Sequence, residues 1–174
     1  SYKYLGQKIS FENRMENEIN QRVASAWRAF WSMKYFLLGN LPIFHKVKLL
    51  NSILNVMTYG CQSWTLDENL RNKLRVARHT MERKILNVRK LDKVSNKKIR
   101  KITKATDVID YSKQLKWRFA GHVQRLQDDR WTLKIEKWIP QSSRKKGRPK
   151  TRWRDEIEEH AGVLWRRTAQ NRNT

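Results

Sequence analysis

Apolar residues recur at every third or fourth position along three successive stretches of the first half of the chain. This period places them on one face of a helix, so the pattern predicts three amphipathic helices. The connections between the stretches are short, which favours a small antiparallel bundle. The apolar positions are Met15, Ile19, Val23, Ala26, Phe30 and Met33, then Ile43, Val47, Leu50, Leu54 and Met57, then Leu66, Leu70, Leu74, Ala77, Met81, Ile85 and Val88.

Residues that favour helix ends separate the three stretches. Gly39 and Asn40 are typical of a helix C-terminus, and Pro42 is typical of the first turn of the next helix. Thr65 and Glu68 have the spacing of a capping box for the third helix. The basic residues of that helix are expected to face solvent. They are Arg71, Lys73, Arg75, Arg78 and Arg83.

The chain outside these stretches predicts one strand and several shorter helices. Residues 2–9 alternate weakly and are aromatic, which predicts a short strand or half of a hairpin whose pairing strand lies outside this sequence. Ser95 is placed to cap a short helix, and further helices are predicted over 109–126 and 131–138. A last amphipathic helix follows Thr151. Its apolar face is formed by Trp153, Ile157, Ala161 and Leu164.

The expected fold class is therefore mainly α, with a short strand at the N-terminus. The predicted organisation is a strand over 1–10, a three-helix bundle over 11–92, a helical connector over 93–140, and a basic linker with the C-terminal helix over 141–174. The chain starts at Ser1 without a methionine, and we expect it to be a fragment of a larger protein.

The charge of the chain changes what such a fold is expected to do. Lysine and arginine number 39 against 16 aspartate and glutamate, a net charge of +23. An excess of this size favours a polyanionic partner, and nucleic acid is the natural one. Eight tryptophans and a hydrophobic content of 39% argue against a disordered basic tail, because such tails lack aromatic residues.

The sharpest local feature is the basic linker over residues 141–150. Closely spaced cations without acidic neighbours can follow a phosphate backbone and release counterions. Its Gly147-Arg148-Pro149 sequence also resembles the core of an AT-hook, in which arginine enters the narrow minor groove of A·T-rich DNA. The alternative is a solvated basic tether between two helices.

Three groups of basic residues are the candidate nucleic-acid contacts. Trp117, which lies between Lys116 and Arg118, is the best candidate for stacking on a base. The candidates are Arg144, Lys145, Lys146, Arg148, Lys150, Arg152 and Arg154 in and after the linker, Lys97, Lys98, Arg100 and Lys101 before it, and Lys116 and Arg118 in the helix over 109–126.

The sequence contains no recognisable catalytic centre. Cys61 is the only cysteine, which excludes an intrachain disulfide and a zinc site built on cysteine pairs. Asp128 and Asp129 are paired carboxylates, but a loop between helices explains them better than a metal site. No cofactor is expected. With this cysteine content we expect a reducing, intracellular setting. No apolar run is long enough to span a bilayer, so no membrane partner is expected.

Four segments together resemble the region that follows the catalytic palm in reverse transcriptases of non-LTR (LINE-type) retrotransposons. They are Tyr4-Leu5-Gly6 with Ile9, residues 58–64 (TYGCQSW), residues 119–123 (FAGHV) and residues 147–157 (GRPKTRWRDEI). Their order along the chain is the same, and the resemblance covers nearly the whole sequence.

The resemblance implies that Tyr4, Leu5 and Gly6 lie in a primer-grip hairpin, and that the helices up to residue 92 form the thumb, which closes on a template-primer duplex of RNA or DNA. The remainder would help to hold template RNA or target DNA. The aromatic-Ala-Asp-Asp motif of the family's palm is absent from this sequence. The resemblance thus implies an upstream palm as partner, a divalent metal only in that palm, no polymerase activity of this chain alone, and a nuclear site of action.

Two alternatives stay open at this stage. The first is a stand-alone basic helical DNA-binding protein that uses the bundle and the linker. The second is a non-enzymatic protein-interaction module whose charge is incidental to its function.

Overall fold

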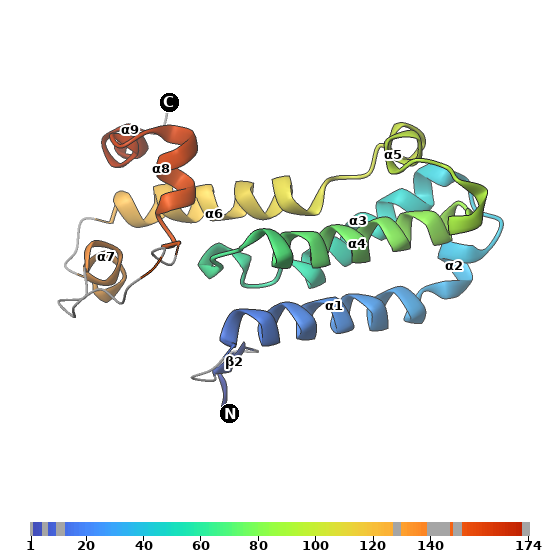
Figure 1. The fold of residues 1–174 in the computed structure, drawn as a ribbon, viewed down its shortest axis with the longest axis horizontal. Coiled ribbons are helices and arrows are strands. Elements are labelled where there is room, and N and C mark those ends of the chain that lie inside the picture. Colours follow the sequence, from blue (N-terminus) through green and yellow to red (C-terminus); the bar gives the residue numbers. More distant parts are fainter. Residues whose placement is uncertain are drawn as a thin grey trace. The chain divides into compact units, whose positions relative to one another are not determined.

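The chain forms two compact units. A computed structural model describes residues 2–4, 7–9, 13–126, 130–138, 147 and 151–171 (Figure 1). The first unit comprises Ser1–Cys61 with Leu66–Ser112, and the second comprises Gln62–Thr65 with Lys113–Thr174. Most of the described residues are helical, so the prediction of a mainly α fold is confirmed.

Two short strands open the first unit. They are β1 (Tyr2–Tyr4) and β2 (Gln7–Ile9), which pair antiparallel with Tyr2 opposite Ile9. The expectation of a strand remnant, whose partner lies outside this sequence, is not supported, because the two halves of the segment pair with each other. An adjacent antiparallel partner satisfies the backbone groups of both strands locally.

The predicted bundle consists of α1 (Arg14–Ser32), α3 (Ile43–Met57) and α4 (Glu68–Ile85), which lie side by side in Figure 1. The apolar stripes face one another and supply the core of this unit, so the periodicity located the buried faces correctly. Fully or almost fully buried core residues are Ile19, Ala26, Phe30, Leu50, Ile53, Leu54, Met57, Leu74 and Met81.

The ends of these helices differ in part from the prediction. The first helix stops at Ser32, and a short helix α2 (Lys34–Leu38) follows, which buries Leu37. Gly39 ends α2, and a Cβ at this position would collide with the carbonyl oxygen of Tyr35. The predicted capping box of α4 is wrong: the N-cap is Asp67, whose side chain accepts a hydrogen bond from the backbone N–H of Leu70.

The rest of the first unit is short elements. A 3-10 helix η1 (Cys61–Ser63) begins with the buried Cys61, and another, η2 (Lys90–Asp92), follows α4. They are followed by α5 (Asn96–Thr103), whose N-cap is Ser95 as predicted, and by α6 (Val108–Gln124), whose later turns belong to the second unit.

The second unit also contains α7 (Trp131–Lys137), α8 (Asp155–Ala161) and α9 (Trp165–Gln170). Ala120, Ile157 and Trp165 form its buried cluster. The sequence predicted one helix after Thr151, but the chain turns at Gly162, whose φ of 77° is unfavourable for other residues. The turn buries Trp165 and leaves the predicted face residue Leu164 exposed.

The shared core of the first unit makes a direct prediction about its stability. Leu74 is fully buried in α4, whereas Val76, two residues further along the same helix, is 55% exposed. Leu74→Asp should abolish cooperative thermal unfolding, because an unpaired carboxylate in an apolar core costs several kcal/mol. Val76→Asp should change the free energy of unfolding by less than about 0.5 kcal/mol. Circular dichroism melting of both variants checks this, and similar melting curves would refute the assigned bundle core.

Candidate nucleic-acid interface

The short helix α5 presents basic side chains from a firmly anchored backbone. Ile99 and Thr103 are buried on its inner face. The hydroxyl of Ser95 accepts a hydrogen bond from the backbone N–H of Lys98 at 3.2 Å, which satisfies one of the free N–H groups of the first turn. The exposed residues of α5 include Lys97, Lys98 and Lys101.

Arg83 fixes the start of α5 to α4. Its Nη2 donates to the carbonyl oxygen of Val94 at 2.6 Å and to Oδ1 of Asn96 at 2.8 Å. A guanidinium that holds a backbone carbonyl and a side-chain amide together defines the orientation of the following turn.

Asp107 fixes the other end of α5 while it caps α6. Its Oδ2 lies 2.7 Å from Nη2 of Arg100, and its Oδ1 accepts from the backbone N–H groups of Ile109 at 2.7 Å and Asp110 at 3.2 Å. Burial by itself raises the pKa of Asp107. The two backbone hydrogen bonds and the Arg100 guanidinium outweigh that effect and hold the pKa below its ordinary value of 3.8.

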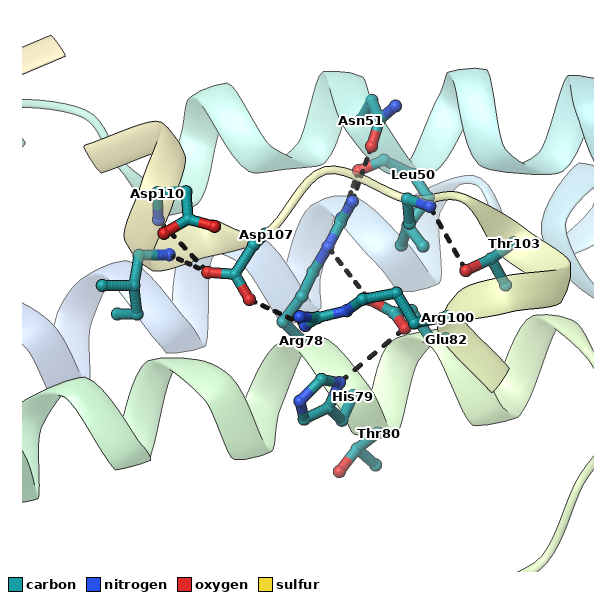
Figure 2. Close-up of polar contacts among 12 residues, drawn as sticks. Leu50, Asn51, Arg78, His79, Thr80, Glu82, Arg100, Thr103, Asp107 and Asp110 are labelled. Atoms are coloured by element: carbon teal, nitrogen blue, oxygen red, sulfur yellow. Dashed lines mark hydrogen bonds and ion pairs between the residues drawn. The ribbon is translucent and has the colours of Figure 1, made fainter. Parts of the chain in front are cut away.

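Beneath this region lies a buried polar network centred on Arg78, shown in Figure 2. Its Nη1 donates to the carbonyl oxygen of Leu50 at 2.7 Å and its Nη2 donates to Oδ1 of Asn51 at 2.6 Å. The fully buried carboxylate of Glu82 lies 3.7 Å from Nε of Arg78 and 3.7 Å from Nδ1 of His79.

The expectation that Arg78 faces solvent is therefore wrong. Its side chain has no exposed surface, and burial lowers its pKa to about 10, while Glu82 acts in the opposite direction. At neutral pH the group is still charged. The helical period alone cannot distinguish a solvated arginine from one buried beside a carboxylate four residues later.

His79 and α5 together line an open groove of about 450 Å³. The residues lining this α5 groove are His79, Asn96, Lys97, Arg100 and Lys101. Three of them, Lys97, Arg100 and Lys101, were predicted from the sequence as nucleic-acid contacts, and the structure brings them together.

The lysines of α5 differ from the basic residues of α4 in their pairing. Within the described part of the chain, Lys97, Lys98 and Lys101 form no ion pair. On α4, by contrast, Nζ of Lys73 lies 2.6 Å from Oε1 of Glu16, and Nη1 of Arg75 lies 2.5 Å from Oε1 of Glu68. The three α5 lysines thus carry positive charge that no acidic side chain of the described residues compensates.

The residues predicted on α6 are not equivalent to one another. Lys116 is 3% exposed, and its Nζ lies 2.6 Å from Oε2 of the buried Glu156, so this lysine has a structural role in the second unit. Arg118 is exposed. The ring of Trp117 is 42% exposed and packs against that of His160, with centroids 5.7 Å apart.

The other predicted residues fall into two sets. Arg152 and Arg154 line a pocket of the second unit, and Tyr4 lies in β1. The remaining ones lie outside the described residues, as does the Asp128-Asp129 pair. They are Leu5, Gly6, Arg144, Lys145, Lys146, Arg148 and Lys150.

Two features of these surfaces were not predicted. His79 joins the α5 groove from α4, and Trp131 and Trp138 line the same pocket as Arg152. The second feature left a signal in the sequence, since Trp131, Ile135 and Trp138 share one helical face directly before the basic linker. From that spacing we predicted only the short helix over 131–138.

The described residues offer neither a metal site nor a membrane-spanning helix. They contain no group of three or more His, Cys, Asp or Glu side chains arranged to hold a metal ion. None of the described helices has both the length and the apolar character needed for a transmembrane span.

Comparison with known proteins shows a similarity to a protein that is described as transposon-derived. The chain is 32% identical over 163 residues to this Caenorhabditis elegans protein, which is also described as uncharacterized. The aligned region covers 90% of this chain and 58% of that relative, so the chain spans less than two thirds of the relative's length. No protein-family model matches the sequence, and no solved structure matches it significantly.

The anchoring of α5 by Asp107 predicts a pH-dependent loss of stability. Because the folded-state pKa of Asp107 is depressed, its stabilising effect is present above the ordinary pKa of 3.8 and is lost as the pH falls below it. Asp107→Asn should reduce the free energy of unfolding by about 1–2 kcal/mol at pH 7. Urea unfolding of variant and parent should converge at the lowest pH values. A gap that persists there would contradict the ion-pair role, and Asp110→Asn serves as the exposed control from the same turn.

The buried network predicts that substitutions of Arg78 and Glu82 have strongly coupled effects on the free energy of unfolding. Arg78→Met should destabilise the chain by about 3–5 kcal/mol, because it leaves the buried Glu82 without its cation. Arg78→Met combined with Glu82→Leu should recover most of that loss, since a buried ion pair can be replaced by apolar side chains at little cost. Urea titrations of the two single variants and the double variant measure the coupling. Additive effects would show that the two side chains act independently.

Proposed function

We propose that this chain is the nucleic-acid-gripping, thumb-like and C-terminal part of a retrotransposon reverse transcriptase. The observation that carries the proposal is the α5 groove, where Lys97 and Lys101 stand without acidic partners beside an arginine of fixed position. Phosphate groups of a template-primer duplex are the ligands that this arrangement suits best.

The side chains of the groove suit phosphate in complementary ways. Asp107 holds the guanidinium of Arg100 in place, so that it can bind an anion with little loss of side-chain entropy. Lysine ammonium groups are compact point charges that adjust to the position of a phosphate oxygen. The imidazole of His79, from α4, and the amide of Asn96, from α5, add hydrogen-bonding groups to the lining of the groove.

Two further lines support a transposable-element origin and a thumb-like role. The transposon-derived description of the C. elegans relative agrees with the resemblance to LINE-type reverse transcriptases. A helical bundle that follows a short β-hairpin also has the element order which that resemblance implies for a primer grip and thumb. The basic residues 144–150 would add phosphate contacts. Polymerisation and its divalent metal would belong to a palm that this sequence does not contain.

The proposal predicts how the salt dependence of binding should change on substitution. Lys97→Ala with Lys101→Ala should lower the slope of log affinity against log salt for duplex DNA by about 1.8, since each phosphate contact contributes about 0.9. The matched control is Lys73→Ala with Arg75→Ala, which removes the same charge from sites already neutralised by Glu16 and Glu68. Filter binding at several salt concentrations measures both slopes.

The control variant should leave the slope nearly unchanged. All four side chains lie on the surface or half exposed, so the folds of both variants should be intact, which their melting curves check. Equal changes in slope for both variants would mean that the effect comes from net charge alone. An unchanged slope in the α5 variant would reject the α5 groove as a phosphate site.

A further inference from the structure

A second pocket, of about 580 Å³, lies within the second unit and has an aromatic lining. Trp131, Ile135 and Trp138 border it from α7 and its C-cap, Phe119 from α6, and Trp153 from the segment before α8. The volume is in the range of pockets that hold small organic groups. We refer to it as the tryptophan pocket.

Two of the tryptophans that line the tryptophan pocket are largely exposed. Trp131 is 77% exposed and Trp138 is 66% exposed, whereas Trp165 in the core of the same unit is 3% exposed. Indole rings exposed to this degree contribute little to folding. They do offer flat surfaces on which a planar ligand can stack.

The charged residues around the tryptophan pocket favour an anionic ligand. Arg152 and Arg154 line it, and Nζ of Lys134 lies 5.4 Å from the centroid of the Trp131 ring. One carboxylate, that of Glu136, also borders the pocket. Its Oε1 is 2.7 Å from Nη2 of Arg166, so its charge is compensated within the protein.

We propose that the tryptophan pocket receives an unpaired base of single-stranded nucleic acid, stacked on Trp131 or Trp138, while Arg152 and Arg154 contact the neighbouring phosphates. This inference rests on the proposed nucleic-acid function. It adds that the ligand is single-stranded and that one of its bases stacks on a tryptophan. Stacking on an aromatic ring accepts any base, because every base has a π face. A rim of arginines around aromatic platforms is suited to single strands in general.

Two probes of equal charge separate base stacking from phosphate contact. The first is a 15-nucleotide single strand of thymidine, and the second is the same strand with abasic sites at every position. The parent chain should bind the thymidine strand about 5- to 100-fold more tightly than the abasic strand, as expected for the loss of one stacked base. Trp131→Ala with Trp138→Ala should abolish this preference and leave the affinity for the abasic strand unchanged.

Trp117→Ala is the matched control, because this tryptophan is also exposed but does not line the tryptophan pocket. It should keep the full preference for the thymidine strand. Equal binding of both probes by the parent chain, or a preference that survives in the double variant, would overturn the pocket as a base site while nucleic-acid binding stands. Failure of the parent chain to bind either probe or duplex DNA at low salt would overturn the proposed function as well.

Discussion

The buried guanidinium of Arg78 is the constraint on which the first unit depends. A cation in an apolar bundle is tolerated only where its donors are satisfied and its charge is countered. Leu50 and Asn51 of α3 accept its hydrogen bonds, and Glu82 of α4 supplies the opposite charge. These contacts fix the register of α3 against α4. Glu82 in turn lies 3.7 Å from Nδ1 of His79, which lines the α5 groove.

Buried or partly buried carboxylates determine where the excess positive charge of the chain is exposed. Glu82, Asp107, Glu136 and Glu156 each pair with a cation that holds the fold together. With 16 acidic residues against 39 basic ones, most cations have no such partner. The carboxylates near α5 pair with the arginines that hold the fold together. The charges of the exposed α5 lysines therefore remain uncompensated. The internal pairing therefore produces the external electrostatic pattern that nucleic-acid binding would use.

The sequence predicted the helical bundle well because burial follows the 3.6-residue period. Ile19, Leu50 and Leu74 lie in the core as their stripes indicate. It failed at positions where a long-range partner decides the outcome. Arg78 and Lys116 look like surface cations until α3 is packed over Arg78 and Glu156 is placed beside Lys116. The groove residues on α5 could be predicted as a basic run, but their meeting with His79 of α4 depends on tertiary packing.

The two candidate contact surfaces differ in the physics of binding, and this difference has a mechanistic meaning. Phosphate contacts at α5 weaken steeply with salt and do not depend on whether the bases are paired. Stacking in the tryptophan pocket requires a base that is free of its partner strand. A chain with both surfaces could hold a duplex through one unit and an unpaired strand through the other. Template-directed synthesis presents both kinds of strand at once, because a copied duplex is always continuous with a template that is still single-stranded. The exposed tryptophans would then have a function that neither core packing nor net charge explains.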